Sequence, residues 1–144
     1  MKNKKFWVAF LVVFIILILS DYVINGIILN STYSSEEVSK VFRPTDKIIS
    51  NMWIMWVVDL IWSYFFVFFF AKGYENRGVI EGLRYGFYIG IFFYLTSSYY
   101  QYAVYPLPYS LIFQWFVYGL VQALILGLIT ALIYKPAQPK QTES

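Results

Sequence analysis

Four long apolar runs limit what this chain can fold into. They lie at about residues 6–29, 50–71, 82–104 and 109–134. Each run is longer than the roughly 20 residues that an α-helix needs to cross the hydrocarbon of a bilayer. The pattern predicts an all-α integral membrane protein in which residues 1–144 form a single domain, a bundle of four transmembrane helices.

The connections between the runs predict the topology. Residues 30–49 are polar and form the longest loop, with a short helix expected after Ser34 or Ser35, while residues 135–144 form a polar tail. Lysine and arginine are unequally distributed: eight lie on one side (Lys2, Lys4, Lys5, Lys72, Arg77, Arg84, Lys135 and Lys140) and three on the other (Lys40, Arg43 and Lys47). The positive-inside rule therefore predicts cytoplasmic termini, an outer loop at 30–49 and a multi-pass location in the inner (cytoplasmic) membrane.

Composition excludes several kinds of chemistry. The chain has no cysteine and no histidine, which removes disulfides, thiolate chemistry, iron–sulfur ligation and the commonest metal ligand and general base. We therefore expect no cofactor and no metal site. The net charge is +3, but the basic residues stand at the ends of the runs, so membrane orientation explains them better than nucleic-acid binding does.

Two aspartates lie inside the apolar runs. Asp21 and Asp59 are predicted to lie at a similar depth in the outer half of the bundle, with Asn25 and Ser63 each four residues later on the same helix face. Gln114 in the fourth run is expected at a similar depth. Because a carboxylate in hydrocarbon costs several kcal/mol, each aspartate must face the bundle interior, a partner or water.

These polar residues allow more than one interpretation. They form a proton, cation or ligand site, or they join helices through hydrogen bonds. A third alternative is that the first helix breaks at Asn25-Gly26 and leaves Asp21 at a hydrated helix end. Aromatic residues make up 23% of the chain and favour the membrane interfaces, or they line a pocket above the aspartates to which Gln101 and Gln122 add polar contacts.

Small residues recur every four positions in the third and fourth runs. Stripes of this spacing let two helix backbones approach closely. The short connection through Pro106 and Pro108 makes the two helices antiparallel neighbours, so we expect the stripes to pack on each other or to face another subunit. The residues concerned are Gly78, Gly82, Gly86 and Gly90, and Gly119, Ala123, Gly127 and Ala131.

Several short segments carry a resemblance: Asp21-Tyr22 with Asn25-Gly26, Lys72-Gly73-Tyr74-Glu75, Glu81-Gly82-Leu83-Arg84-Tyr85-Gly86, and Gln101-Tyr102 ahead of Pro106-Leu107-Pro108. In these the chain resembles a group of small bacterial membrane proteins with four spans. The resemblance implies the fold and a bacterial membrane location, and it implies no activity.

Three classes of function follow from these observations. The first is a non-catalytic accessory or scaffold subunit of a membrane assembly, which the small size, short loops and small-residue stripes favour. The second is a small proton- or cation-coupled transporter or channel that uses Asp21 and Asp59 and acts as a homo-oligomer. The third, an enzyme, is disfavoured because no nucleophile and base are paired in the sequence. We expect the first class, with the lipid bilayer and other membrane subunits as partners.

Overall fold

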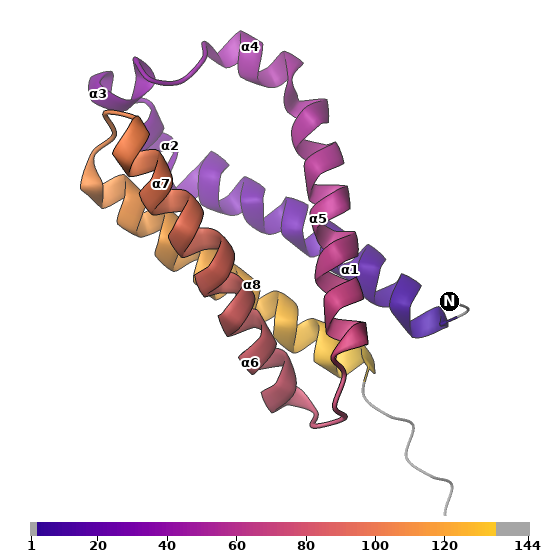
Figure 1. Cartoon of the computed structure of the whole chain (residues 1–144). Helices are drawn as coiled ribbons and strands as arrows, with labels where there is room; N and C mark the ends of the chain where they lie inside the picture. The colour runs from indigo at the N-terminus through magenta and orange to yellow at the C-terminus, as the bar shows by residue number, and fades with distance from the viewer. Residues whose placement is uncertain (1–2, 135–144) are drawn as a thin grey trace, which may run out of the picture.

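A computed structural model describes residues 3–134, which are helical in all their regular elements and contain no strand. The predicted tail at 135–144 and Lys2 lie outside the described residues. Figure 1 shows long helices crossing one another, with an arch of short helices between α1 and α5. The elements are α1 (Lys4–Asp21), η1 (Tyr22–Ile28), α2 (Asn30–Tyr33), α3 (Glu36–Ser39), α4 (Thr45–Ser50), α5 (Met52–Lys72), α6 (Val79–Gly90), η2 (Ile91–Leu95), α7 (Thr96–Val104) and α8 (Tyr109–Tyr134).

The all-helical prediction is confirmed, and three helices are long and apolar enough to cross a membrane. They are Lys4–Ile28, which joins α1 to η1, then α5 and α8. The segment from α6 through η2 to α7 forms one continuous helix of sufficient length, but the charged residues near its start and its serines and tyrosines lower its mean hydropathy. The structure thus describes a membrane protein with three such helices, and the fourth span stays a prediction.

The closest helix pair is α6 with α8. A Cβ atom added at Gly82 would lie 2.9 Å from the carbonyl carbon of Gly127, and one added at Gly86 would lie 2.9 Å from that of Ala123. Real Cβ atoms do not approach other atoms so closely, so both glycines are required by the contact. Two further glycines of the stripes are close to the facing helix as well: Gly90 to Leu120 and Ala123, and Gly119 to the ring of Tyr94. Gly78 takes no part, because it precedes α6 and a Cβ atom added there would meet nothing within 4 Å.

The core at one end of the bundle joins α1, α5 and α8. Phe6, Ala9, Val13 and Leu17 recur every three or four residues along α1, so they line one face of that helix and are buried. They pack in one cluster with residues from the second half of α5 and the end of α8: Phe66, Val67, Phe70, Leu126, Ala131 and Tyr134. Tyr74 donates a hydrogen bond to the carbonyl of Tyr134 at 2.7 Å, which closes this end.

A second, smaller cluster holds the polar loop against the other end. Leu29, directly before the loop, and Val38 within it are buried with Leu107 and with two residues at the start of α8, Leu111 and Ile112. The short helix expected after Ser34 or Ser35 is present as α3. Buried apolar side chains from the loop and from the connection between α7 and α8 therefore hold residues 30–49 against α8.

The first half of α5, residues 52–61, is exposed at every position except Asp59, which is partly buried. The same helix buries Ser63, Phe66, Val67 and Phe70 in its second half. In Figure 1, α5 crosses α1 and leads away from the other helices toward α4. Half of a strongly apolar helix thus has no packing partner within residues 3–134.

Two stretches of π-helix interrupt the long helices. Residues 22–28 form η1, and the helix therefore continues past Asn25-Gly26 instead of breaking there. The alternative in which Asp21 stands at a broken helix end is wrong. The second stretch, η2, lies between α6 and α7. Such wide turns are often found at functional sites, and η1 begins directly after Asp21.

Candidate functional site

Gln122 is the centre of a polar network that joins three helical segments. Its amide nitrogen donates to Asp21 Oδ1 at 2.7 Å and to Ser20 Oγ at 2.6 Å, and its amide oxygen accepts from the hydroxyl of Tyr94 at 2.7 Å. Gln122 is only 4% exposed. The network therefore fixes the end of α1 and the η2 stretch to the middle of α8, and it supplies Asp21 with the donor that a carboxylate in an apolar bundle requires.

A pocket of about 270 Å³ lies beside this network. Its wall combines the carboxyl group of Asp21 with amide, hydroxyl and aromatic groups from η1, η2, α7 and α8. Such a mixture can hold a cation through a carboxylate and ring faces together, or a small ligand through hydrogen bonds. The lining residues are Asp21, Ile24, Asn25, Phe93, Tyr94, Ser97, Ser98, Gln101, Trp115, Tyr118, Gly119 and Gln122.

A second chain of hydrogen bonds connects the pocket to the polar loop. The indole of Trp115 donates to the hydroxyl of Tyr33 at 2.7 Å, and that hydroxyl donates to Asn25 Oδ1 at 2.7 Å. Asn25 in turn donates to the backbone carbonyl of Asp21 at 3.2 Å. Tyr33 thus joins the loop, η1 and α8 at one point at the edge of the pocket.

Removing the Tyr33 hydroxyl should loosen this connection. We expect Tyr33→Phe to leave the Trp115 N–H without its acceptor and to cost about 1–3 kcal/mol. Limited proteolysis of the 30–49 loop measures the effect, with Tyr100→Phe as a control because Tyr100 is 73% exposed and makes no hydrogen bond within residues 3–134. Equal cleavage rates for the two variants would contradict this role.

The two predicted aspartates lie near each other, although only one has a hydrogen-bond partner. The carboxyl groups of Asp59 and Asp21 are within electrostatic range, and both are within range of the Tyr94 hydroxyl. Asp59 makes no hydrogen bond or ion pair to any residue that the structure describes. Its neighbour Ser63 is fully buried, and the Ser63 hydroxyl has no hydrogen-bond partner within residues 3–134.

Gln114 takes no part in the network. It does not line the pocket and makes no hydrogen bond in the described part of the chain. The structure brings Gln122, one of the two glutamines expected above the aspartates, to Asp21. The reason is that the sequence estimate counts depth at the α-helical rise from the ends of the apolar runs, whereas residues 22–28 form a π-helix with wider turns, so equal counts do not give equal depths.

No protein-family model, curated protein or solved structure matches the chain. The resemblance to small bacterial four-span proteins therefore stays a prediction. The candidate site is assigned from its geometry alone. Within residues 3–134, no group of three or more carboxylates is placed so that it could hold a metal ion.

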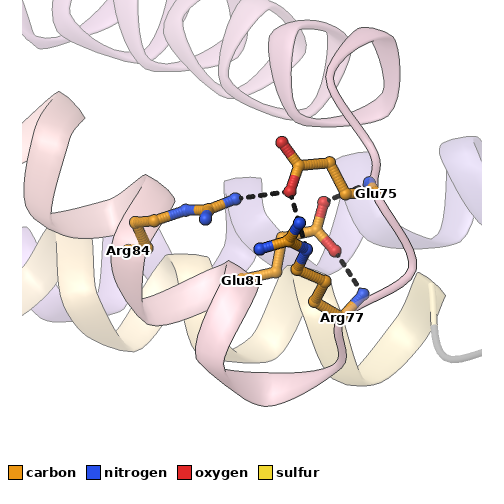
Figure 2. Close-up of polar contacts among 4 residues, drawn as sticks. All are labelled: Glu75, Arg77, Glu81 and Arg84. Atoms are coloured by element: carbon orange, nitrogen blue, oxygen red, sulfur yellow. Dashed lines mark hydrogen bonds and ion pairs between the residues drawn. The ribbon is translucent and has the colours of Figure 1, made fainter.

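Charged residues gather at the opposite end of the bundle, in the turn between α5 and α6. Glu81 is 4% exposed, and its carboxylate accepts the backbone N–H groups of Glu75 at 2.6 Å and Arg77 at 2.9 Å. Figure 2 shows Glu75 with Arg77 and Arg84, whose guanidinium groups both reach Glu75 Oε2, at 3.0 and 2.9 Å. Because each acid is already engaged within the turn, this cluster has a structural role, which is to order the link between α5 and α6.

The ion pairs in this turn should make the stability of the protein depend on pH. The hydrogen bond and the charge of Arg84, followed by the charge of Arg77, lower the pKa of Glu75 below its ordinary value. The ion pairs therefore stabilise the folded state above the ordinary glutamate pKa of about 4.3, and this stabilisation is lost as the pH falls through the lowered value. We expect Glu75→Gln to remove part of the decrease in melting temperature between neutral and acidic pH.

The control for this measurement is Glu37→Gln, because Glu37 is exposed and makes no ion pair in the described residues. Its melting temperature should depend on pH as that of the unmodified protein does. Identical pH profiles for all three proteins would show that the Glu75 pairs add nothing to stability.

Proposed function

We propose that this chain is a non-catalytic accessory or scaffold subunit of a membrane assembly, with four transmembrane helices and both termini in the cytoplasm. The observation that carries the proposal is the first half of α5. It is apolar and exposed, and its one charged residue, Asp59, has no hydrogen bond or ion pair among residues 3–134. Lipid covers an apolar surface well, but it offers a carboxyl group no partner in the hydrocarbon.

Two further features support the four-span topology. The start of α1 and the end of α8 lie at the same end of the bundle in Figure 1, as an even number of crossings requires. The helical segment from Val79 to Val104 is antiparallel to α8 and packs on it through the glycine contacts. A helix paired so closely with a long apolar helix crosses the membrane with it, and the Glu81 and Arg84 side chains then lie at its cytoplasmic end.

The test is purification of the tagged chain from its own membranes in a mild detergent, followed by mass spectrometry. We expect at least one other membrane protein in a fixed molar ratio to this chain after a second purification step. Recovery of the chain alone, or only as a homo-oligomer, would contradict the accessory role.

A second candidate function is a small proton- or cation-coupled transporter. It is favoured by the carboxyl group of Asp21 in the wall of a pocket of about 270 Å³, with the carboxyl group of Asp59 within electrostatic range of it. Flux into vesicles that contain only this protein, driven by a proton or sodium gradient and abolished by Asp21→Asn and by Asp59→Asn, would support the transporter and replace the accessory role. Absence of flux in such vesicles would remove this alternative.

A further inference from the structure

The side chains of α5 that pack inside the bundle belong to a stripe that continues beyond it. Ser63, Phe66, Val67 and Phe70 are buried at a spacing of three and four residues. Counted back from Ser63 with the same spacing, the next positions on this helix face are Asp59, Trp56, Met55 and Met52. Met52, Met55 and Trp56 are exposed and have no helix packed against them in the described chain, and Asp59 beside them is only partly buried, so much of this face is unused.

The composition of this unused face suits a partner helix. Met52 and Met55 are flexible, polarizable side chains of the kind found on adaptable binding surfaces. Trp56 is 52% exposed and lies one turn from Asp59, so its ring and the carboxyl group are presented together. A carboxylate beside an indole ring is well suited to a cationic side chain, which the ring face and the negative charge both attract.

A second copy of this chain does not provide that cation. In a symmetric parallel pair, residues meet others of similar depth, and no lysine or arginine lies in the first half of α5 or in the segments facing it. Lys47 in α4 precedes α5 and Lys72 is the last residue of α5, so neither lies at the depth of Asp59 within the helix. Arg77 and Arg84 lie beyond α5 and already bind Glu75.

We infer that the first half of α5 is the docking surface for a transmembrane helix of a different protein that carries a lysine or arginine at the depth of Asp59. This inference rests on the proposed accessory role and specifies the chemistry of the partner. The partner helix lies along Met52, Met55 and Trp56, and its basic group pairs with Asp59. Two opposite charges that are each costly in hydrocarbon stabilise one another when they meet, and this makes the association selective.

The test uses synthetic single-span helices as probes. One peptide is a run of leucines with a central lysine, and a second has leucine at that position. Each carries a fluorescent acceptor, and the full chain carries the donor, in vesicles of neutral phosphatidylcholine. We expect the lysine peptide to associate about tenfold more strongly or better, which corresponds to about 1.4 kcal/mol.

Variants of the full chain assign the preference to Asp59. Asp59→Asn should reduce association of the lysine peptide to that of the leucine peptide, whereas Asp46→Asn in the exposed α4 helix should leave the preference intact. The melting temperature of each variant shows whether it is folded, and Trp56→Leu offers a second variant that keeps the carboxyl group and should weaken the preference.

Equal association of the two peptides with the unmodified chain would overturn the inference, as would a preference that survives Asp59→Asn. These results are separate from the test of the accessory role. A native partner recovered in a fixed ratio, together with equal peptide association, would leave the accessory role in place and reject only the basic transmembrane helix.

Discussion

Replacing Gly86 by alanine should separate α6 from α8 and destabilise the protein by about 1–3 kcal/mol or more, as overpacking of a tight contact does. The added Cβ would lie 2.9 Å from the carbonyl carbon of Ala123, which belongs to the backbone and cannot rotate away. Gly82→Ala should have a similar effect, because its Cβ would meet both the backbone of Gly127 and the side chain of Ala131.

The matched control is Gly73→Ala. A Cβ at Gly73 would lie 3.6 Å from the nearest atom, the carbonyl oxygen of Phe69, which is an ordinary contact. Thermal unfolding in detergent, followed by circular dichroism, should show a lower melting temperature for Gly82→Ala and Gly86→Ala and almost none of this change for Gly73→Ala. A small effect at all three positions would mean that α6 and α8 are not in backbone contact.

Replacing Gln122 by leucine is expected to have the second large effect. The variant removes three hydrogen bonds and leaves Asp21 Oδ1, Ser20 Oγ and the Tyr94 hydroxyl without their partner. Three bonds at the average of about 0.6 kcal/mol measured in membranes amount to roughly 2 kcal/mol. The cost should be greater because a carboxyl group is left unpaired, so we expect about 2–4 kcal/mol.

Gln114→Leu is the control for Gln122→Leu, since it makes the same change in the same helix at a residue without a hydrogen bond in the described chain. It should leave the melting temperature unchanged or raise it. Combining Gln122→Leu with Tyr94→Phe tests the network directly, because residues that share a bond should give a combined loss smaller than the sum of the single losses. Additive losses would show that the Tyr94–Gln122 bond contributes nothing.

Much of the helical architecture follows from hydropathy and spacing. The fourth run was expected at residues 109–134, and α8 has those bounds. The glycines of the third run at every fourth position indicate a face that other backbones approach closely, and α6 packs on α8 along that face. These features are predictable because they depend on the length of an apolar run and on glycines, which lack a side chain, recurring every four residues.

The candidate site was less predictable, for a physical reason. A count of residues at the α-helical rise assumes a regular helix, whereas η1 widens the turns of the first helix from Tyr22 to Ile28. The contact of Asp21 with Gln122 depends on that register, which no short sequence pattern reveals. The direction of α5 could not be predicted either. Hydropathy shows that this helix is apolar on all sides, but it does not show which side packs against the other helices of the chain.

The wide turns of η1 have a consequence for how this sequence can vary in length. Asp21 at one end of η1 is tied to α8 through Gln122, while Tyr33 beyond the other end is tied to α8 through Trp115. Adding or deleting one residue between those anchor points would rotate everything after it by one residue's share of a helical turn, which is about 100° in an α-helix and less in the wider π-helix. Only one of the two attachments would then survive, so related chains with these two attachments should keep the number of residues between Asp21 and Tyr33 unchanged.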